Sequence, residues 1–521
     1  MYILLCLCTV LLLIEGSTVP IYGQAGQSFQ LDCGSGSSLS TNFSWSYSPL
    51  PTSSSPHRLF STLYPPAGHP QFPGVTFTAF GSVLIIANLS KSDEGRYHCH
   101  AVRETEVKIE DFDLLLRESH SPNCHADPPS PWPQCKEGPS ASGEETLSAA
   151  LTHLALRLYN LASTRHWDNL FFSPVSITRA LAHLLLGARG HTRSVLERAL
   201  SLPQDFYCIH EKMRRLEGEL GKSFMSDSRI YYTPELILHD FFINQTQEFY
   251  EGAPEPLTEV NVKLINDWAS KKTNGQITHL LHSVPKNTQL LLLDIAHYNG
   301  QWQEGFELSE TKVGEFIAMG GVRVHVPLMN SIVHNITLQR SEHFQAQVAR
   351  LPLSDGVSAL FLLPLSASLA SLREVEQGLT GDGGATALRK LAVSMVTADP
   401  QVAKVVLPRL SLEWESDSKL LRSLGLEDLF DTPNLCGLSS SLPLSLSDSK
   451  HRTLVSLSED GVVGEGASNS SYTSLPHFSA LHPFILVLWS EGAGVPLFIG
   501  RVADPSMGLW EREREREIGG E

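Results

Sequence analysis

Cysteine is the residue type in this chain whose number and spacing predict a definite chemistry. Two of the eight cysteines, Cys6 and Cys8, lie in an apolar N-terminal segment, and six follow at positions 33, 99, 124, 135, 208 and 436. An even number of cysteines in an oxidising compartment predicts disulfides, and six cysteines would form three. Six cysteines allow 15 sets of pairings, and the residues alone do not choose among them. No Cys-x-x-Cys or cysteine–histidine cluster has zinc-ligand spacing, so we expect no metal site.

Motifs that build enzyme active sites are missing. The sequence lacks Gly-x-Ser-x-Gly, Gly-x-Gly-x-x-Gly and His-Glu-x-x-His, and Gly221-Lys-Ser has no upstream glycine to complete a phosphate-binding loop. The 21 histidines are scattered, and a lone histidine such as His183 in a helical pattern is more often packed than catalytic. We therefore expect no enzyme, no catalytic residue and no cofactor.

Asparagine sequons offer a second chemistry, N-glycosylation. The Asn-x-Ser/Thr pattern occurs at Asn42, Asn88, Asn244, Asn335 and Asn469. The first four are interpreted as solubilising surface sites, whereas Asn469 falls in a segment discussed below.

The composition is that of a folded protein with an export signal. A chain of 521 residues, 42% apolar and 18% charged, has room for two to four domains, and a net charge of −17 without a basic run argues against nucleic acid as a partner. Residues 1–17 form an apolar stretch followed by small residues and predict a signal peptide. No later segment reaches the roughly 18 apolar residues of a membrane helix, so the mature chain is expected to be secreted, without a membrane span.

Residues 18–117 carry the pattern of a β-sandwich. Phe29, Leu31 and Cys33 alternate with polar residues, Trp45 comes next, and Asp93-Glu-Gly-Arg-Tyr-His-Cys99 closes the segment. A disulfide between two sheets, a tryptophan packed on it and a tyrosine two residues before the second cysteine are typical of immunoglobulin domains. This segment therefore resembles an all-β immunoglobulin-like sandwich, whose ligand the sequence does not reveal.

Residues 118–143 predict a linker. They contain six prolines, which remove backbone donors and favour extended chain. Because Cys124 and Cys135 lie within it, we expect the linker to be tied to a neighbour, or else closed by a disulfide between these two cysteines.

Residues 144–505 predict one large α+β domain. A capping box, Ser142-x-x-Glu145, precedes one helix; Ser173 and Pro174 open a second that ends at Gly187, and Thr192 opens a third. Strands are expected at residues 290–295, 402–407, 484–489 and 496–499. Helices and strands mix without regular alternation or an internal repeat.

Read together, several motifs of this domain resemble the serpin family. They include Asn169-Leu-Phe-Phe-Ser-Pro-Val-Ser-Ile, Gly300-Gln-Trp, Leu407-Pro-Arg-Leu, Glu459-Asp-Gly, His482-Pro-Phe and Pro496-Leu-Phe-Ile-Gly-Arg-Val-Ala-Asp-Pro. Residues 205–210, 434–438 and 487–489 are most similar to a plasma serpin that regulates complement and contact-system proteases. The family has fish members in which immunoglobulin-like segments precede the serpin domain. That resemblance implies disulfides Cys124–Cys436 and Cys135–Cys208, in addition to Cys33–Cys99.

The resemblance also implies a mechanism. A serpin presents a loop as bait; after cleavage by a serine protease, the loop inserts into the main sheet and the trapped protease is distorted. Insertion needs small side chains at alternate positions of the hinge, because every second residue faces the interior. The hinge runs from Glu459 through Gly461 to Val462, Gly464 and Gly466, where glycines replace the usual alanines and weaken a strand.

The bait residue is unusual for the family. Spacing from Glu459 gives Leu475, followed by a hindering Pro476, whereas alignment with the complement-regulating serpin gives Ser474 or Thr473. No Lys or Arg lies between Gly461 and Pro483, although complement and contact-system proteases prefer a cation. A glycan on Asn469 would shield the loop or obstruct its insertion.

Further positions come from the resemblance alone. The family positions that control opening of the main sheet correspond here to Ser173, Ser176, Asp294, Trp302 and His451. The family usually has asparagine where Asp294 stands, so this carboxylate either pairs with His451 or weakens the closure.

Two functions follow from this reading. The first is a secreted, monomeric, serpin-type inhibitor of serine proteases that acts by suicide-substrate trapping and regulates complement and contact or coagulation proteases. The alternative is a non-inhibitory serpin-fold binding or carrier protein with an immunoglobulin recognition domain. Residues 506–521 form a charge-alternating tail that we expect to be disordered.

Overall fold

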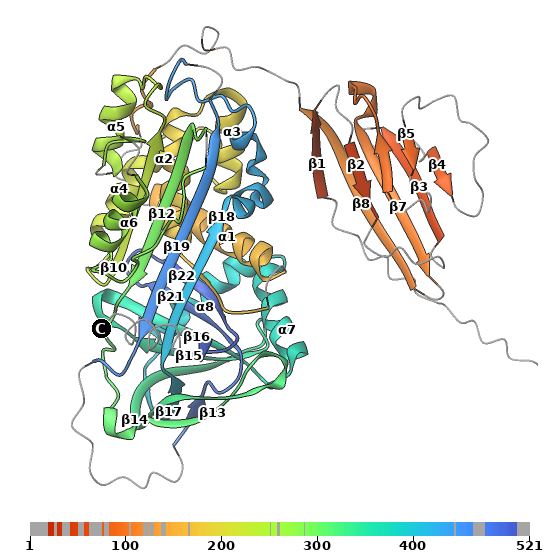
Figure 1. Cartoon of the computed structure of the whole chain (residues 1–521). Helices are drawn as coiled ribbons and strands as arrows, with labels where there is room; N and C mark the ends of the chain where they lie inside the picture. Colours follow the sequence, from red (N-terminus) through yellow and green to blue (C-terminus); the bar gives the residue numbers. More distant parts are fainter. Residues whose placement is uncertain are drawn as a thin grey trace, which may run out of the picture. The chain divides into compact units, whose positions relative to one another are not determined.

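The computed structural model separates the chain into two compact units, Met1–Ser121 and Pro122–Glu521, drawn in Figure 1. The described residues are 19–24, 29–33, 42–49, 57–61, 75–77, 83–103, 106–117, 124, 130–136, 142–164, 167–250, 252–257, 261–285, 287–441, 444–461 and 475–507. The predicted signal peptide and residues 508–521 of the predicted tail lie outside them. Ser506, the first residue of the predicted tail, is described, and its backbone N–H donates to Asp504 Oδ1 at 2.8 Å.

The described residues of the first unit form strands, with one short turn of helix at Lys91–Asp93. One sheet has the order β1-β8-β7-β3-β4 and the other β2-β6-β5. The bounds are β1 Val19–Gln24, β2 Phe29–Asp32, β3 Asn42–Pro49, β4 His57–Ser61, β5 Val75–Phe77, β6 Val83–Ile86, β7 Gly95–Arg103 and β8 Glu106–Arg117. Their inward side chains form a separate apolar core.

A disulfide joins the two sheets of this unit. Cys33 follows β2 and bonds Cys99 on β7, with Cα atoms 5.9 Å apart. Trp45 on β3 is fully buried beside it, and its register partner across the sheet is Cys99. The Tyr97 hydroxyl donates to the Asp93 carbonyl at 2.8 Å, which fastens β7 to the turn that precedes it. The alternating apolar residues of the sequence thus form the interior of this unit.

The second unit contains a five-stranded main sheet of order β11-β10-β12-β19-β18. The bounds are β10 Phe224–Tyr232, β11 Glu255–Pro256, β12 Leu290–Tyr298, β18 Leu410–Asp417 and β19 Leu446–Leu457. All nine residues of β12 are buried, as expected for a central strand covered on both faces.

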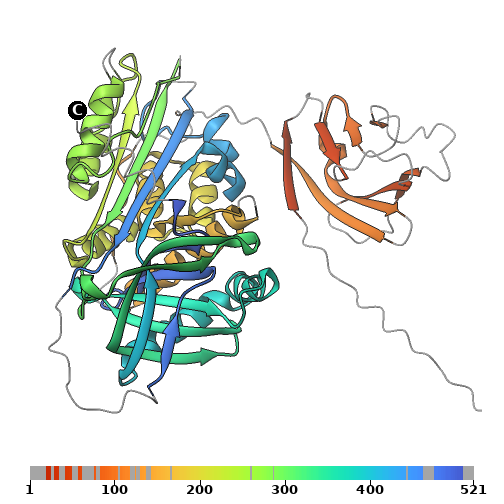
Figure 2. The same ribbon diagram turned by 60° about the horizontal axis from the view of Figure 1, so that its bottom comes forward.

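A nine-stranded sheet forms the rest of the strand framework, as Figure 2 shows from below. Its order is β20-β17-β14-β15-β16-β21-β22-β9, and β13 pairs with β14 beside this path. The bounds are β9 Leu170–Phe172, β13 Lys312–Ile317, β14 Arg323–Ser341, β15 Ala346–Pro352, β16 Val357–Pro364, β17 Gln401–Pro408, β20 His477–Ser479, β21 Phe484–Ser490 and β22 Val495–Val502.

Helices complete the unit; of the three helix starts that the sequence predicted, one is confirmed and two differ. The bounds are α1 Ser142–Ser163, α2 Pro174–Gly187, α3 Gly190–Ala199, α4 Ile209–Glu219, α5 Asp240–Tyr250, α6 Asn261–Lys272, α7 Leu369–Thr380, α8 Gly384–Thr397 and α9 Ser418–Leu421. Ser173 caps α2 as predicted, accepting from the Ser176 N–H at 3.2 Å. The predicted start of α3 at Thr192 is wrong: the helix begins at Gly190, and the Thr192 hydroxyl donates to Asp428 at 2.6 Å. Ser142 is already the first residue of α1.

A buried cation locks the last strand to two helices. Arg501 on β22 has no exposed surface, and its guanidinium donates to Glu376 Oε1 on α7 at 2.6 Å. The Tyr159 hydroxyl of α1 donates to the same oxygen at 2.7 Å. A buried charge is tolerated only when it is paired, so Glu376 is needed wherever Arg501 is present.

We predict that Glu376→Ala lowers the free energy of unfolding of the second unit by about 3–5 kcal/mol, because it leaves the Arg501 cation buried without its carboxylate. Urea unfolding of the full chain measures this change. The matched control is Glu374→Ala on the exposed side of the same helix, which should shift the transition by less than about 0.5 kcal/mol. Equal effects of the two variants would contradict the assignment.

Candidate functional site

The main sheet has a seam between two parallel strands. β12 and β19 pair directly from Leu290↔Leu446 to Tyr298↔Val455, and Figure 1 shows them side by side as green and blue arrows. The chain leaves β19 at Leu457, and the next described strand is β20 in the other sheet. A segment that turned back from the end of β19 would run antiparallel to both strands and could bond to both. The seam is therefore a place where one further strand fits.

Four buried residues close the seam at its middle, and we call them the shutter: Ser173, Ser176, Asp294 and His451. Asp294 on β12 and His451 on β19 are register partners, and His451 Nδ1 lies 2.5 Å from Asp294 Oδ2. The Ser176 hydroxyl of α2 donates to the other carboxylate oxygen at 2.5 Å. All four predicted positions are thus brought together.

The shutter has one consistent assignment of protons. The Ser173 N–H points at His451 Nε2 at 3.4 Å, so this nitrogen accepts and the ring proton sits on Nδ1. Nδ1–H then donates to Asp294, which accepts from two sides as a carboxylate. An asparagine would present one oxygen and one NH2 group in place of the two carboxylate oxygens, so it could not accept at both of these positions. Of the two alternatives left open by the sequence, the structure shows pairing of Asp294 with His451.

A second set of contacts, which we call the breach, holds the chain where it leaves β19. The Trp302 indole donates to the Ser458 carbonyl at 2.5 Å, and its backbone N–H donates to the Asp460 carbonyl at 2.8 Å. Gly461 forms a bridge with Trp302. A Cβ atom on Gly461 would lie 2.5 Å from the Trp302 carbonyl oxygen, so glycine is required here by close backbone approach.

Glu459 is the charged anchor of the breach. Arg409 donates to its two oxygens at 2.6 and 3.1 Å, and the Thr311 hydroxyl donates at 2.7 Å. Burial opposes ionisation of Glu459, but the hydrogen bonds from Arg409 and Thr311 outweigh it, so the pKa lies below its ordinary value. Arg409 belongs to the Leu-Pro-Arg-Leu motif of the sequence, yet its partner could not be read from the motif.

Backbone contacts hold both ends of the predicted bait segment, Gly461 on Trp302 and Pro476 on Lys404. Val462, Gly464, Gly466, Asn469, Thr473 and Ser474 lie outside the described residues. At the far end the Lys404 N–H donates to the Pro476 carbonyl at 2.8 Å, and His477 already pairs with β17. A protease needs extended chain on both sides of the bond it cuts. Cleavage after Leu475 would leave Pro476 as the single residue between the cut bond and His477, which pairs with β17. This geometry disfavours Leu475 as the bait.

Two disulfides tie the predicted linker to the second unit. Cys124 bonds Cys436 and Cys135 bonds Cys208, with Cα atoms 5.3 and 4.5 Å apart. The alternative bond between Cys124 and Cys135 is therefore absent. These are the pairs that the serpin resemblance implied, and residues alone had left them open.

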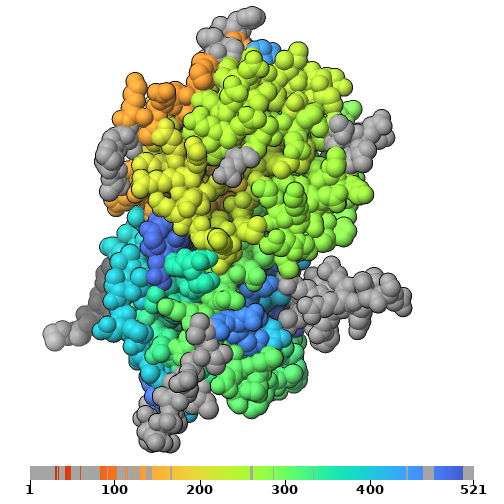
Figure 3. Space-filling model, turned by 90° about the vertical axis from the view of Figure 1, so that its left-hand side faces the viewer, coloured from red at the N-terminus to blue at the C-terminus, as the bar shows by residue number. Residues whose placement is uncertain are grey.

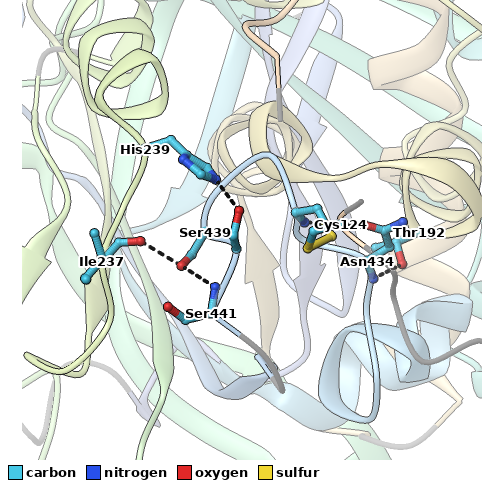
Figure 4. The surroundings of a disulfide bond; sticks show 9 residues. Cys124, Thr192, Ile237, His239, Asn434, Ser439 and Ser441 are labelled. Carbon is cyan, nitrogen blue, oxygen red and sulfur yellow. Dashed lines mark hydrogen bonds between the residues drawn. A yellow bond between two sulfur atoms is a disulfide. The ribbon is translucent and has the colours of Figure 1, made fainter. Parts of the chain in front are cut away.

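The loop that carries Cys436 is held on both sides, as Figure 4 shows. The Asn434 N–H donates to the Thr192 hydroxyl at 2.8 Å, and the Ser439 hydroxyl donates to the Ile237 carbonyl at 2.7 Å. A Cβ atom on Gly187 would lie 2.7 Å from Leu438 Cβ, so the loop packs directly on the end of α2. The linker is thus bonded to a rigid part of the unit.

Trp132 anchors the linker without a covalent bond, and sequence reasoning missed it. Its side chain is 4% exposed, and its indole N–H donates to the Tyr207 carbonyl at 2.9 Å. Gln245 on α5 makes two hydrogen bonds with its backbone, and Arg193 lies 4.7 Å above the ring. The sequence signal that could have indicated this anchor is a single large apolar residue, Trp132, in a proline-rich linker.

The buried histidines behave as core residues. Burial, and to a smaller extent the Arg179 cation, lowers the pKa of His183 to about 3, and its Nε2 lies 3.2 Å from the Thr246 hydroxyl. Burial also lowers the pKa of His210, whose Nδ1 is 2.6 Å from the Tyr250 hydroxyl. Within the described residues no cluster of His, Cys, Asp and Glu has metal-binding geometry, and no helix is long and apolar enough to span a membrane.

We predict that the breach weakens in acid through Glu459. A carboxyl with a lowered folded pKa stabilises the fold above its ordinary pKa of 4.5, and this contribution is lost as the pH falls through the folded value. Wild type should therefore exceed Glu459→Gln in thermal midpoint at neutral pH, and the difference should shrink below pH 4.5. A pH series of thermal unfolding of both proteins checks this, and a constant difference down to about pH 3 would refute it.

Comparisons with known proteins agree with this geometry. The model of the serpin (serine protease inhibitor) family matches residues 149–505. Plasma protease C1 inhibitor of Homo sapiens is 33% identical over 384 residues, which cover 72% of this chain and 75% of that protein. Factor XIIa inhibitor of Bos taurus is 32% identical over 382 residues, 72% and 79% of the two chains. These relatives are protease inhibitors, not enzymes.

A solved structure carries the same fold. Human glycosylated kallistatin superposes with a TM-score of 0.64 at 26% identity, over 70% of this chain and 99% of that one. Together with the seam, the shutter and the breach, the match over residues 149–505 shows that the chain belongs to the serpin family.

Proposed function

We propose that this chain is a secreted serine protease inhibitor that traps its target by inserting a cleaved loop between β12 and β19. The observation that carries the proposal is the seam: two parallel strands pair directly, and the segment that continues from β19 is held by Trp302 and, through Glu459, by Arg409. Cleavage of the loop frees this segment to turn back. The acyl-enzyme then moves with it, and the protease active site is distorted.

The hinge would insert with alternate side chains facing the two sides of the sheet. If Val462 points inward, Gly464, Gly466 and Ser468 do as well, and all three are small enough to pass the shutter. Glycine at two of these positions contributes less to a strand than alanine would. The small size of these side chains therefore favours insertion, whereas the low strand propensity of glycine disfavours it.

The bait falls at Thr473 or Ser474 in this proposal. Alignment of the sequence with the complement-regulating relatives gives these positions, and the anchoring of Pro476 on the sheet disfavours Leu475. Neither residue is basic, so the target accepts a small uncharged side chain. Complement and contact-system proteases remain the proposed targets on the strength of the relatives alone, which include plasma protease C1 inhibitor and factor XIIa inhibitor, because the bait lacks the cation that such proteases prefer.

The proposal extends to the rest of the chain. Residues 1–17 direct secretion, residues 18–117 form an immunoglobulin-like recognition domain, and residues 118–143 tether it by disulfides to a monomeric serpin domain at 144–505. Two sheets joined by Cys33–Cys99 around Trp45 support the second of these assignments. Asn42, Asn88, Asn244 and Asn335 are exposed, which suits glycan acceptors.

The alternative is a non-inhibitory serpin-fold binding or carrier protein with an immunoglobulin recognition domain. The glycines of the hinge and the lack of a basic bait favour it. In that case cleavage of the loop would leave the main sheet five-stranded.

We predict that the purified protein forms a covalent complex with a trypsin-, chymotrypsin- or elastase-like protease, stable in denaturing electrophoresis. Mass spectrometry of the released C-terminal peptide should place cleavage after Thr473 or Ser474. Complement proteases belong in the same panel. Clean cleavage without a complex, together with an unchanged thermal midpoint of the nicked protein, would favour the carrier.

A pair of variants separates insertion from cleavage. Gly464→Arg places a cation on the inward side of the inserted strand, where burial costs at least about 3 kcal/mol and should shift the outcome from complex to cleaved product by about 100-fold. Glu465→Arg adds the same side chain on the outward side and should leave complex formation close to wild type. Densitometry of complex and cleaved bands measures the ratio, and equal ratios for the two variants would contradict strand insertion.

A further inference from the structure

The chain leaves the second unit at a corner where large apolar side chains face solvent. Those exposed there, among the described residues, are Trp167, Val322, Leu365, Leu369 and Met507. Arg373 of α7 lies 5.1 Å from the centre of the Trp167 ring, so this tryptophan belongs to the same corner as α7. Single exposed apolar residues are common, whereas a group of them marks a surface that binds something.

Two backbone contacts join the chain end to this corner. The Met319 N–H donates to the Ala503 carbonyl at 3.0 Å, which ties the turn before β14 to the end of β22. Asn169 Nδ2 donates to the Asp504 carbonyl at 2.7 Å, which ties the start of β9 to the same chain end. The exposed apolar side chains therefore lie around the point where the chain leaves the unit.

A cavity opens at this corner. It measures about 280 Å³ and lies between the turn Met319–Gly321, the start of α7 at Leu369 and the segment His482–Pro483. A Cβ atom on Gly320 or Gly321 would meet no atom within 4 Å, so the turn leaves its side of the cavity uncovered. Because a cavity of about 150 Å³ can hold benzene, this one has room for a larger aromatic side chain.

A larger cavity of the same unit differs in chemical character. It measures about 410 Å³ and lies beside α4 and α6, which contribute to the yellow-green and green upper half of the face in Figure 3. Charged side chains line it and already pair with each other, Arg179 with Glu217 and Lys272 with Asp227. None of the residues that line the corner cavity is acidic, and none is a lysine or an arginine. The corner cavity therefore suits an uncharged occupant.

His482 gives the corner cavity an acceptor for an N–H group. Its Nδ1 lies 3.4 Å from the Pro483 carbonyl, so the ring proton sits on Nδ1 and Nε2 carries the lone pair. Burial lowers the pKa of His482, which keeps the ring uncharged at neutral pH. Among the described residues, His482 Nε2 has no hydrogen-bond partner. An indole combines the aromatic bulk and the single N–H donor that this cavity can accept.

The chain itself supplies an indole three residues beyond its last described position. The exit is fixed, because the Ser506 N–H and hydroxyl both donate to Asp504 Oδ1, at 2.8 and 2.6 Å. Leu509 and Trp510 follow Met507 and precede the run of alternating Glu and Arg. Extended chain advances about 3.3–3.6 Å per residue, so Trp510 reaches at most about 11 Å from Met507. A tether this short gives Trp510 a high effective concentration at the corner.

We propose that the C-terminal tail folds back at this corner, with Trp510 in the cavity and Leu509 against its rim at Leu369. The charge-alternating residues from Glu511 onward stay in solvent. Docking covers apolar side chains that otherwise face water, which is the driving force. The assignment does not depend on the proposed inhibitory function, because neither the seam nor the bait takes part in it.

Fluorine NMR of the full chain labelled with 5-fluorotryptophan tests the docking. Trp510→Phe identifies the Trp510 resonance by its loss. We expect a soluble gadolinium chelate to relax this resonance about tenfold less than in the urea-unfolded chain, which corresponds to about 1.4 kcal/mol in favour of the docked state. Leu369→Gln removes the apolar rim, and Ala367→Phe places a ring in the cavity. Both variants should bring the relaxation close to the unfolded value.

A matched control and three outcomes decide the proposal. Leu264→Gln changes a similarly exposed leucine on α6, away from the corner, and should relax like wild type. A Trp510 resonance as accessible as in the unfolded chain overturns the proposal. Protection that neither cavity variant removes places the tail elsewhere and overturns it as well. Protection that is lost on dilution makes a second copy the occupant and also overturns it, because docking within one chain does not depend on protein concentration.

Hydrogen exchange reads the same contact from the cavity side. Trp510→Ser should speed exchange of the amides in the turn Met319–Gly321 and of Leu369 and Ala370, the first N–H groups of α7, because no side chain then covers them. Trp510→Phe keeps a ring and should preserve most of the protection. Arg512→Gln changes only the part left in solvent and should exchange like wild type. Equal exchange in wild type and Trp510→Ser overturns the proposal.

Discussion

The direct pairing of β12 with β19 is the constraint on which the rest of this structure depends. Parallel neighbours with nothing between them leave no room for an antiparallel strand until they separate, and one buried group of side chains joins them. Asp294, His451 and Ser176 hold the strands together by hydrogen bonds that involve a buried carboxylate. Such contacts are strong only while complete, because a carboxylate without its donors is costly to bury. The closure is therefore cooperative, because loss of one hydrogen bond to Asp294 weakens the others.

Elements on both faces of the main sheet support the shutter side chains. On one face α6 packs against β12, and on the other lies α2, which supplies Ser176 and is capped by Ser173. The Cys436 loop packs on the end of α2 at Gly187, and Trp132 lies against α4 and α5. Both tethering disulfides thus end near the helices behind the shutter. A bond that closes a long loop restricts the unfolded chain most, and the separation between Cys124 and Cys436 is 312 residues.

How far the sequence predicts this structure depends on whether a feature is local. The cap of α2 at Ser173, its end at Gly187 and the alternation around Cys33 are local, and they were read correctly. The start of α3 was misplaced because Thr192 uses its hydroxyl for a distant partner, Asp428, instead of a cap. The shutter positions came from the resemblance, and the sequence could not choose between the two roles of Asp294 because its partner lies on a strand 157 residues away in the chain. The partners of Trp302 escaped prediction because they are backbone carbonyls, which any residue can supply.

Length does not limit insertion of the loop, whereas composition does. The seam spans the nine residues of β12, and the segment from 462 to 473 supplies twelve residues if cleavage follows Thr473. The backbone of an inserted strand can bond on both sides, so hydrogen bonding would be complete. Glycine at 464 and 466 buries almost no apolar surface and costs about 0.5–1 kcal/mol per position relative to alanine. The driving force would then come mainly from backbone pairing. Contacts that keep the seam closed, such as those of Asp294, would therefore weigh more heavily on the outcome than in a serpin with an alanine hinge.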